Sequence, residues 1–143
     1  AIITCYAQGF ALMREASREY GYNLDFARIA SVWLGGCIIR ARALEAIRSA
    51  FTAQPDLPNL LTAEPFRTLA ESAQARLRAV VARAALSGVP VLALAASLGY
   101  LDSYRRERLP ANLLQAQRDY FGAHKYERVD KPRGQQFHTE WTS

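Results

Sequence analysis

One residue near the C-terminus, Arg118, has a side chain and a setting that could bind an anion, and His124 follows it six residues later. Leu114, Arg118 and Phe121 are four and three residues apart, so a helix would place them on one face. A small phosphorylated ligand needs only one or two guanidinium groups, because arginine binds phosphate through two parallel N–H donors. The simpler alternative is that Arg118 is a cation near a helix C-terminus, which the helix dipole stabilises by roughly 0.3–1 kcal/mol. His124 would then be a histidine in the coil after Gly122. Spacing alone favours this simpler alternative.

The other chemically active residues form no recognisable catalytic, cofactor-binding or metal-binding motif. Cys37 is followed by two isoleucines and has no adjacent histidine or GxSxG motif, so we expect a buried, inert thiol. A metal site would need Cys5, Cys37, His124 and His138 to converge, and no pair of them has the spacing of metal ligands. Neither GxGxxG nor GxxxxGKS/T occurs in the sequence. The sequence therefore predicts no catalytic residue, no cofactor-binding residue and no metal ligand.

The composition is typical of one folded intracellular domain. The 143 residues are 50% apolar and 22% charged, which provides enough apolar surface for a core and argues against a disordered chain. Two cysteines are too few for a disulfide scaffold. We therefore expect a reduced, cytoplasmic protein.

The net charge of +5 raises the alternative of a nucleic-acid-binding protein. Basic residues nevertheless alternate with acidic ones along most of the expected helices, and no recognition motif accompanies the basic excess that follows Asp102. Eighteen uncharged residues separate Arg83 from Asp102, but Gly88-Val89-Pro90 interrupts them and disfavours a membrane helix. We expect neither a nucleic-acid partner nor a membrane span.

Apolar residues recur mainly with the period of a helix. Residues 90–101 are apolar nearly all round, which predicts a buried helix with Pro90 in its first turn. Strand character is confined to Gln136–Trp141, and there is no βαβ alternation or internal repeat. The predicted fold class is all-α. One helix is expected to run to about residue 20 and others over about 26–33, 38–53, 63–87, from 90 to the break at Leu109-Pro110, and 111–121, the last of them ended by Gly122.

Four segments carry a resemblance to a known family. Leu109–His124 has the sequence LPANLLQAQRDYFGAH, and GCIIR occurs at 36–40, DSYR at 102–105 and FHTEW at 137–141. Together they resemble the C-terminal part of the decarboxylating 6-phosphogluconate dehydrogenases. The resemblance extends in order over essentially the whole chain.

This resemblance implies an activity that the spacing of residues does not. Enzymes of the family oxidise 6-phosphogluconate with NADP and decarboxylate it to ribulose 5-phosphate and CO2 in the pentose phosphate pathway, which serves gluconate utilization. They are homodimers with an N-terminal Rossmann domain for NADP and a large helical domain, and their catalytic lysine and glutamate lie upstream of the part resembled here. By resemblance, Arg118 and His124 are substrate-binding residues that reach the sugar phosphate in the neighbouring subunit's site.

The resemblance also implies a domain organisation. Residues 1–121 are expected to form part of a multi-helix, bundle-like C-terminal domain, and residues 122–143 an extended tail that reaches the partner subunit. The N-terminal Rossmann domain is absent, and the apolar start without an initiator methionine fits a fragment. We expect this fragment alone to be inactive. The alternative is a stand-alone helical dimerisation module without a ligand role.

Overall fold

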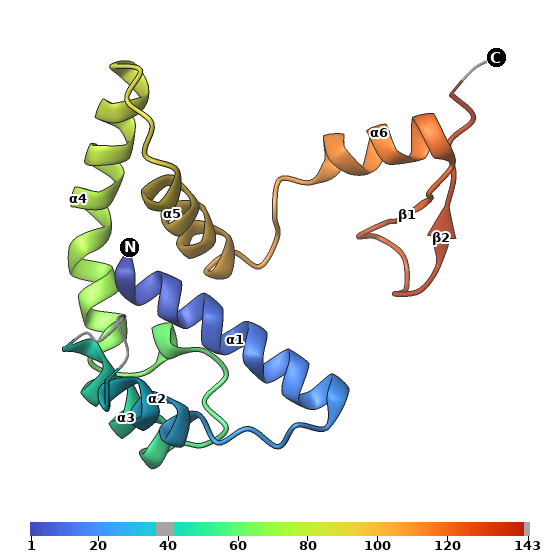
Figure 1. The fold of residues 1–143 in the computed structure, drawn as a ribbon. Coiled ribbons are helices and arrows are strands. Elements are labelled where there is room, and N and C mark those ends of the chain that lie inside the picture. Colours follow the sequence, from blue (N-terminus) through green and yellow to red (C-terminus); the bar gives the residue numbers. More distant parts are fainter. Residues whose placement is uncertain (37–41, 142–143) are drawn as a thin grey trace. The chain divides into compact units, whose positions relative to one another are not determined.

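The computed structural model describes residues 1–36 and 42–141. These residues fall in two compact units, Ala1–Arg105 and Arg106–Ser143. The predicted all-α class is confirmed, because helices dominate the described residues (Figure 1). The elements of the first unit are α1 (Ile2–Tyr20), α2 (Phe26–Leu34), α3 (Ala43–Ala53), the 3-10 helix η1 (Leu60–Thr62), α4 (Phe66–Leu86) and α5 (Leu92–Tyr104). Those of the second are α6 (Asn112–Gly122) and the strands β1 (Tyr126–Glu127) and β2 (Gln136–Phe137).

The first two helices begin and end at local sequence signals. Gly21 follows α1 in the left-handed conformation, with φ of 66°, which glycine adopts at little cost. Asp25 then caps α2, because its side chain accepts a hydrogen bond of 2.9 Å from the backbone N–H of Arg28. Gly21 therefore ends α1, and Asp25 begins α2.

Aromatic side chains form the centre of the first unit's core. The ring of Phe10 on α1 lies 5.9 Å from that of Phe26 on α2 and 4.9 Å from that of Phe51 on α3, measured between centroids. Leu44 and Ile47 of α3 are fully buried beside them. Burying each such side chain contributes about 1.5–3 kcal/mol, so these contacts hold the three helices together.

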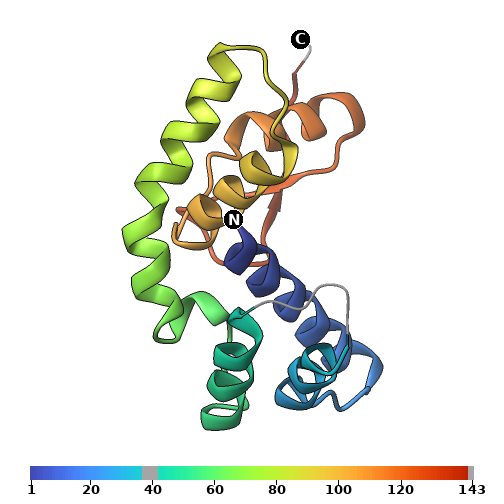
Figure 2. The same cartoon turned by 60° about the vertical axis from the view of Figure 1, so that its left-hand side comes forward.

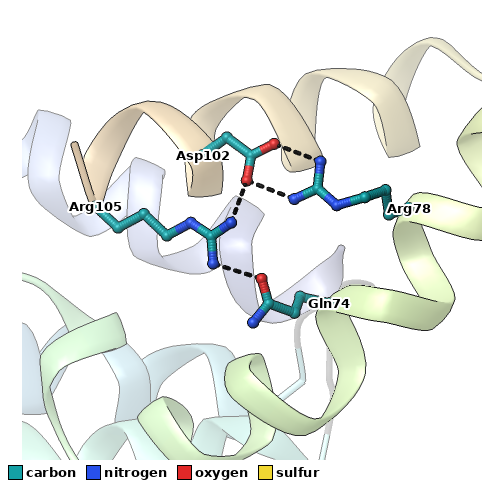
Figure 3. Close-up of polar contacts among 4 residues, drawn as sticks. All are labelled: Gln74, Arg78, Asp102 and Arg105. Carbon is teal, nitrogen blue, oxygen red and sulfur yellow. Dashed lines mark hydrogen bonds and ion pairs between the residues drawn. The ribbon is translucent and has the colours of Figure 1, made fainter. Parts of the chain in front are cut away.

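The helices α4 and α5 run side by side in opposite directions and are joined by residues 87–91 (Figure 2). Asp102 of α5 accepts two hydrogen bonds from Arg78 of α4, at 2.7 and 2.9 Å, and one from Arg105, which also donates to Gln74 (Figure 3). The hydrogen bonds and charge of Arg78 hold the pKa of Asp102 below its usual value. Since both guanidinium groups are about half exposed, this cluster aligns the two helices and adds little net stability.

The structure corrects two expectations about α5. The helix begins at Leu92, so Pro90 precedes it and is not in its first turn. It is also not a buried helix in this chain, because only Ser97 and Leu98 are buried among its residues and Leu92 is 84% exposed. A helix that is apolar all round needs partners on every side, and the first unit packs only α1 and α4 closely against it.

Two further predicted helix limits differ from the structure, and a third falls outside the described residues. The helix expected to continue to Leu109-Pro110 ends at Tyr104. The helix expected from residue 63 begins at Phe66, directly after Pro65. Among the described residues α3 begins at Ala43, whereas the predicted start at residue 38 lies outside them. Cys37 lies outside them as well, so its expected burial stays a prediction. No helix in the described ranges is long and apolar enough to cross a lipid bilayer.

The second unit consists of α6 followed by a short antiparallel hairpin. Tyr126 pairs with Phe137 and Glu127 with Gln136. The sequence indicated strand character over Gln136–Trp141, and the structure confirms a strand at Gln136–Phe137. The strand β1, which pairs with β2, was not predicted. The unit boundary lies between residues 105 and 106, whereas the sequence places the start of the tail at residue 122, and that domain and tail division stays a prediction.

Candidate functional site

The C-terminal end of α6 carries both residues predicted to bind substrate. Arg118 lies in the last turns of the helix and His124 two residues beyond its end, and both are exposed. Within the described part of the chain, the Arg118 guanidinium makes no hydrogen bond or ion pair, so its donors are available to an anion. The His124 ring packs edge-on against Phe121, with centroids 5.7 Å apart. The structure thus places the two predicted residues at one end of one helix.

A tight turn determines how His124 is presented. Ala123 has φ of 47° and Lys125 has φ of 63°, so two left-handed residues flank His124 although neither is glycine. The backbone N–H of Ala123 donates to the carbonyl of Asp119 at 2.9 Å, which closes the helix end. Left-handed backbone costs an L-residue roughly 1–2 kcal/mol, so neighbouring contacts must hold this turn.

Gly122 leaves the space that the His124 ring occupies. The sequence suggested that Gly122 follows the helix and ends it. In the structure, Gly122 is the last residue of α6 itself. A Cβ atom at this position would lie 2.9 Å from both Cδ2 and Nε2 of His124, which is closer than carbon and nitrogen atoms approach without a bond. The observed position of His124 therefore depends on the absence of a side chain at residue 122.

Asp119 is the residue of this site that the sequence analysis missed. It is fully buried, and its carboxylate accepts four hydrogen bonds from the residues that follow α6. Oδ1 accepts from the Lys125 backbone N–H at 3.0 Å and from His138 Nδ1 at 2.9 Å. Oδ2 accepts from the Thr139 backbone N–H and from Trp141 Nε1, both at 2.9 Å. One signal for this residue was in the sequence, since an acidic side chain in the last turn opposes the helix dipole and needs compensating partners.

These hydrogen bonds keep Asp119 ionised. Burial by itself would raise the pKa of this carboxyl, but the hydrogen bonds from His138, the Thr139 amide and Trp141 outweigh it and lower the pKa from 3.8 to about 2. An ionised carboxylate can only accept hydrogen bonds, so His138 carries a proton on Nδ1. The buried charge thus joins α6 to the end of the tail.

Apolar side chains are exposed on both sides of α6. Leu113, Leu114 and Phe121 are 73%, 56% and 72% exposed, while Tyr120 packs edge-on against Trp141. Two apolar faces on one helix are typical of a helix that packs between two other surfaces.

A groove within the second unit is distinct from the candidate site. It has a volume of about 700 Å³ and lies between the start of α6 and the hairpin. Its lining includes Arg108, Leu113, Arg128 and Trp141, but neither Arg118 nor His124. Arg118 and His124 are exposed and lie outside this groove.

Residues 1–141 match one protein family, described as 6-phosphogluconate dehydrogenase, C-terminal domain. The chain belongs to this family. It is 55% identical over 136 residues to the decarboxylating 6-phosphogluconate dehydrogenase of Synechocystis sp., an alignment that covers 95% of this chain and 28% of that protein. It is 52% identical over 139 residues to the NADP(+)-dependent decarboxylating enzyme of Bacillus subtilis, covering 97% and 29%.

A solved structure supports the same assignment. The fold is similar to that of Plasmodium falciparum 6-phosphogluconate dehydrogenase, which was solved as the apo form, with NADP+ and with 6-phosphogluconate. The TM-score is 0.86 at 38% identity, over 97% of this chain and 29% of that one. The chain thus spans 28–29% of the length of these relatives.

The described residues lack the order of elements that is typical of a dinucleotide site. Binding of a dinucleotide pyrophosphate typically uses a strand, a glycine-rich turn and a helix in that order, whereas both strands here follow α6 and lead into no described helix. The described residues also contain no group of three or more His, Cys, Asp or Glu side chains able to hold a metal ion. A role for Arg118 and His124 in binding the substrate stays a prediction.

Proposed function

We propose that this chain is the C-terminal part of an NADP-dependent, decarboxylating 6-phosphogluconate dehydrogenase. The observation that carries the proposal is identity of 50–55% to such enzymes over 95–98% of the chain. Similarity at this level over nearly every position favours the same reaction, the oxidative decarboxylation of 6-phosphogluconate. NADP binding and the chemical step belong to parts of the enzyme outside this chain, so the chain alone is inactive.

Within that enzyme, Arg118 and His124 bind the sugar phosphate. The free Arg118 guanidinium can donate two parallel hydrogen bonds to a phosphate, and His124 can add one from the other side of the turn. Holding the phosphate end fixes the reacting carbons within attack distance, and binding energy far from these carbons then contributes to the rate. Both residues lie on open surface of their own unit, which supports a site completed by another subunit.

The proposed assembly is a cytoplasmic homodimer in which the residues after α6 reach the partner's site. Exposed apolar residues on both faces of α6 support a second protein surface against this helix, since groups of such residues commonly mark interfaces. Neither nucleic acid nor membrane has a part in this function.

Subunit complementation tests whether the two residues work in the partner's site. One subunit carries Arg118→Ala, and the other carries a substitution that disables the substrate site outside this chain. Each homodimer is expected to be nearly inactive. In a mixed dimer, one site combines the intact upstream part of the first subunit with the intact Arg118 of the second. The other site carries both defects.

Random reassociation makes half of the dimers mixed, so activity should recover to about a quarter of the wild-type value. If Arg118 served its own subunit, every site in a mixed dimer would be damaged and nothing would recover. Unchanged KM for 6-phosphogluconate in the Arg118→Ala and His124→Ala homodimers would instead show a dimerisation module without a ligand role.

A further inference from the structure

We infer that Asp119 is a positioning residue, whose carboxylate holds the turn after α6 so that His124 and Arg118 are presented together to the substrate. Asp119 holds the backbone of the turn whatever the chain binds. The effect of this turn on substrate binding rests on the proposed function. Asp119 is fully buried, so it acts through the backbone and not by touching the ligand.

The hydrogen bond to Lys125 is the contact that matters most. Asp119 Oδ1 accepts from the Lys125 backbone N–H at 3.0 Å, directly after His124. Lys125 is left-handed, with φ of 63°, and so is Ala123 on the other side of His124. A strained backbone persists only where its surroundings hold it, and here a charged acceptor does so from the interior.

The other three hydrogen bonds fix the carboxylate in place. His138, Thr139 and Trp141 all donate to it, so its two oxygens are fully used by four donors. This arrangement keeps Oδ1 aimed at Lys125 and leaves the carboxylate little freedom to rotate. Arg118 precedes Asp119 directly on α6, so the same side chain ties the helix end that carries Arg118 to the turn that carries His124.

An amide at position 119 cannot satisfy the same four donors. Asn has one acceptor oxygen, and its NH2 group must replace the other. In the better orientation the oxygen keeps Thr139 and Trp141, and the NH2 group faces His138, which can accept after moving its proton to Nε2. The Lys125 N–H then faces another donor. The geometry therefore predicts that Asp119→Asn loses the Lys125 hydrogen bond first.

Amide hydrogen exchange on the whole chain tests this prediction directly. Asp119→Asn should speed exchange at Lys125 by at least about tenfold while the amides of α6 keep their protection. Asp130→Asn is the matched control, because Asp130 is an exposed carboxylate of the same unit that pairs with Arg128. Unchanged exchange at Lys125 in Asp119→Asn would overturn the inference.

A rescue experiment in the assembled enzyme separates positioning from general support of the tail. Asp119→Asn should raise the KM for 6-phosphogluconate about tenfold and leave the KM for NADP within about twofold. Adding Lys125→Gly should restore part of the loss, because glycine adopts positive φ without help. Adding Lys125→Ala instead removes the same charge but keeps a Cβ atom, so the KM for 6-phosphogluconate should stay raised.

The outcomes distinguish the inference from the proposed function. If Arg118→Ala raises the KM for 6-phosphogluconate but Asp119→Asn does not, the proposed function stands and the inference fails. Equal rescue by glycine and alanine, or no rescue by either, also overturns it, because the backbone conformation of Lys125 would then not be what Asp119 controls. If Arg118→Ala has no effect on KM, the proposed function itself fails.

Discussion

Replacing Gly122 with alanine separates the position of His124 from the stability of α6. The helix should gain about 0.5–1 kcal/mol, since alanine favours helix over glycine by that amount. Against this, the new Cβ atom would lie 2.9 Å from Cδ2 and Nε2 of His124, so the imidazole must turn away. A side chain forced about 30° off its rotamer costs of order 0.5–1.5 kcal/mol. The two effects nearly cancel, and the free energy of unfolding should change by less than about 1 kcal/mol.

Two measurements on the Gly122→Ala protein check this reasoning. Thermal unfolding should show a small change in Tm, while the NMR resonances of the His124 ring should move, because the ring leaves its edge-on contact with Phe121. In the assembled enzyme, the KM for 6-phosphogluconate should rise about as much as in His124→Ala. The matched control is Gly9→Ala in α1, where a Cβ atom would meet nothing within 4 Å. It should stabilise the helix and leave the His124 resonances unchanged.

Two results would refute this account of Gly122. An unchanged His124 ring in Gly122→Ala would mean that the turn accommodates a Cβ atom, so that space at residue 122 does not determine the ring's position. A large loss of stability would mean that the clash is taken up by the backbone of α6 and not by rotation of the imidazole.

Further predictions concern the tail, the core and activity. Because folding lowers the pKa of Asp119 to about 2, its contribution to stability is present above about pH 4 and is lost as the pH falls through 2, so the indole N–H resonance of Trp141 should shift in that window and not between pH 5 and 8. Ala123→Gly should raise the free energy of unfolding by about 0.5–1 kcal/mol in urea titrations, because glycine accepts φ of 47°. Ile47→Ala should lower it by about 2–5 kcal/mol, whereas Leu12→Ala, at a position 71% exposed, should change it by less than about 0.5 kcal/mol. The purified chain should reduce no NADP with 6-phosphogluconate, and reduction by a sample free of host enzyme would contradict this.

The sequence by itself determined most of the helices and the anion-binding candidates. Periodic apolar residues predict α1 closely, because Ala7 and Phe10 are buried on one face of this helix and the period of that face is visible in the chain. Gly21 and Asp25 act within a few residues of themselves, so their roles follow from local chemistry. The motif that contains Arg118 and His124 likewise lies within one continuous segment.

Only the tertiary structure decided the role of Asp119 and the surroundings of α5. The carboxylate of Asp119 meets His138, Thr139 and Trp141, which are about twenty residues away in the sequence, and their convergence depends on the path of the chain after α6. Apolar residues all round α5 predict burial, but burial depends on which other surfaces are present, and Leu92 is 84% exposed. Contacts between distant residues carry no sequence period of their own, so periodicity detects helices but not the partners of a buried charge.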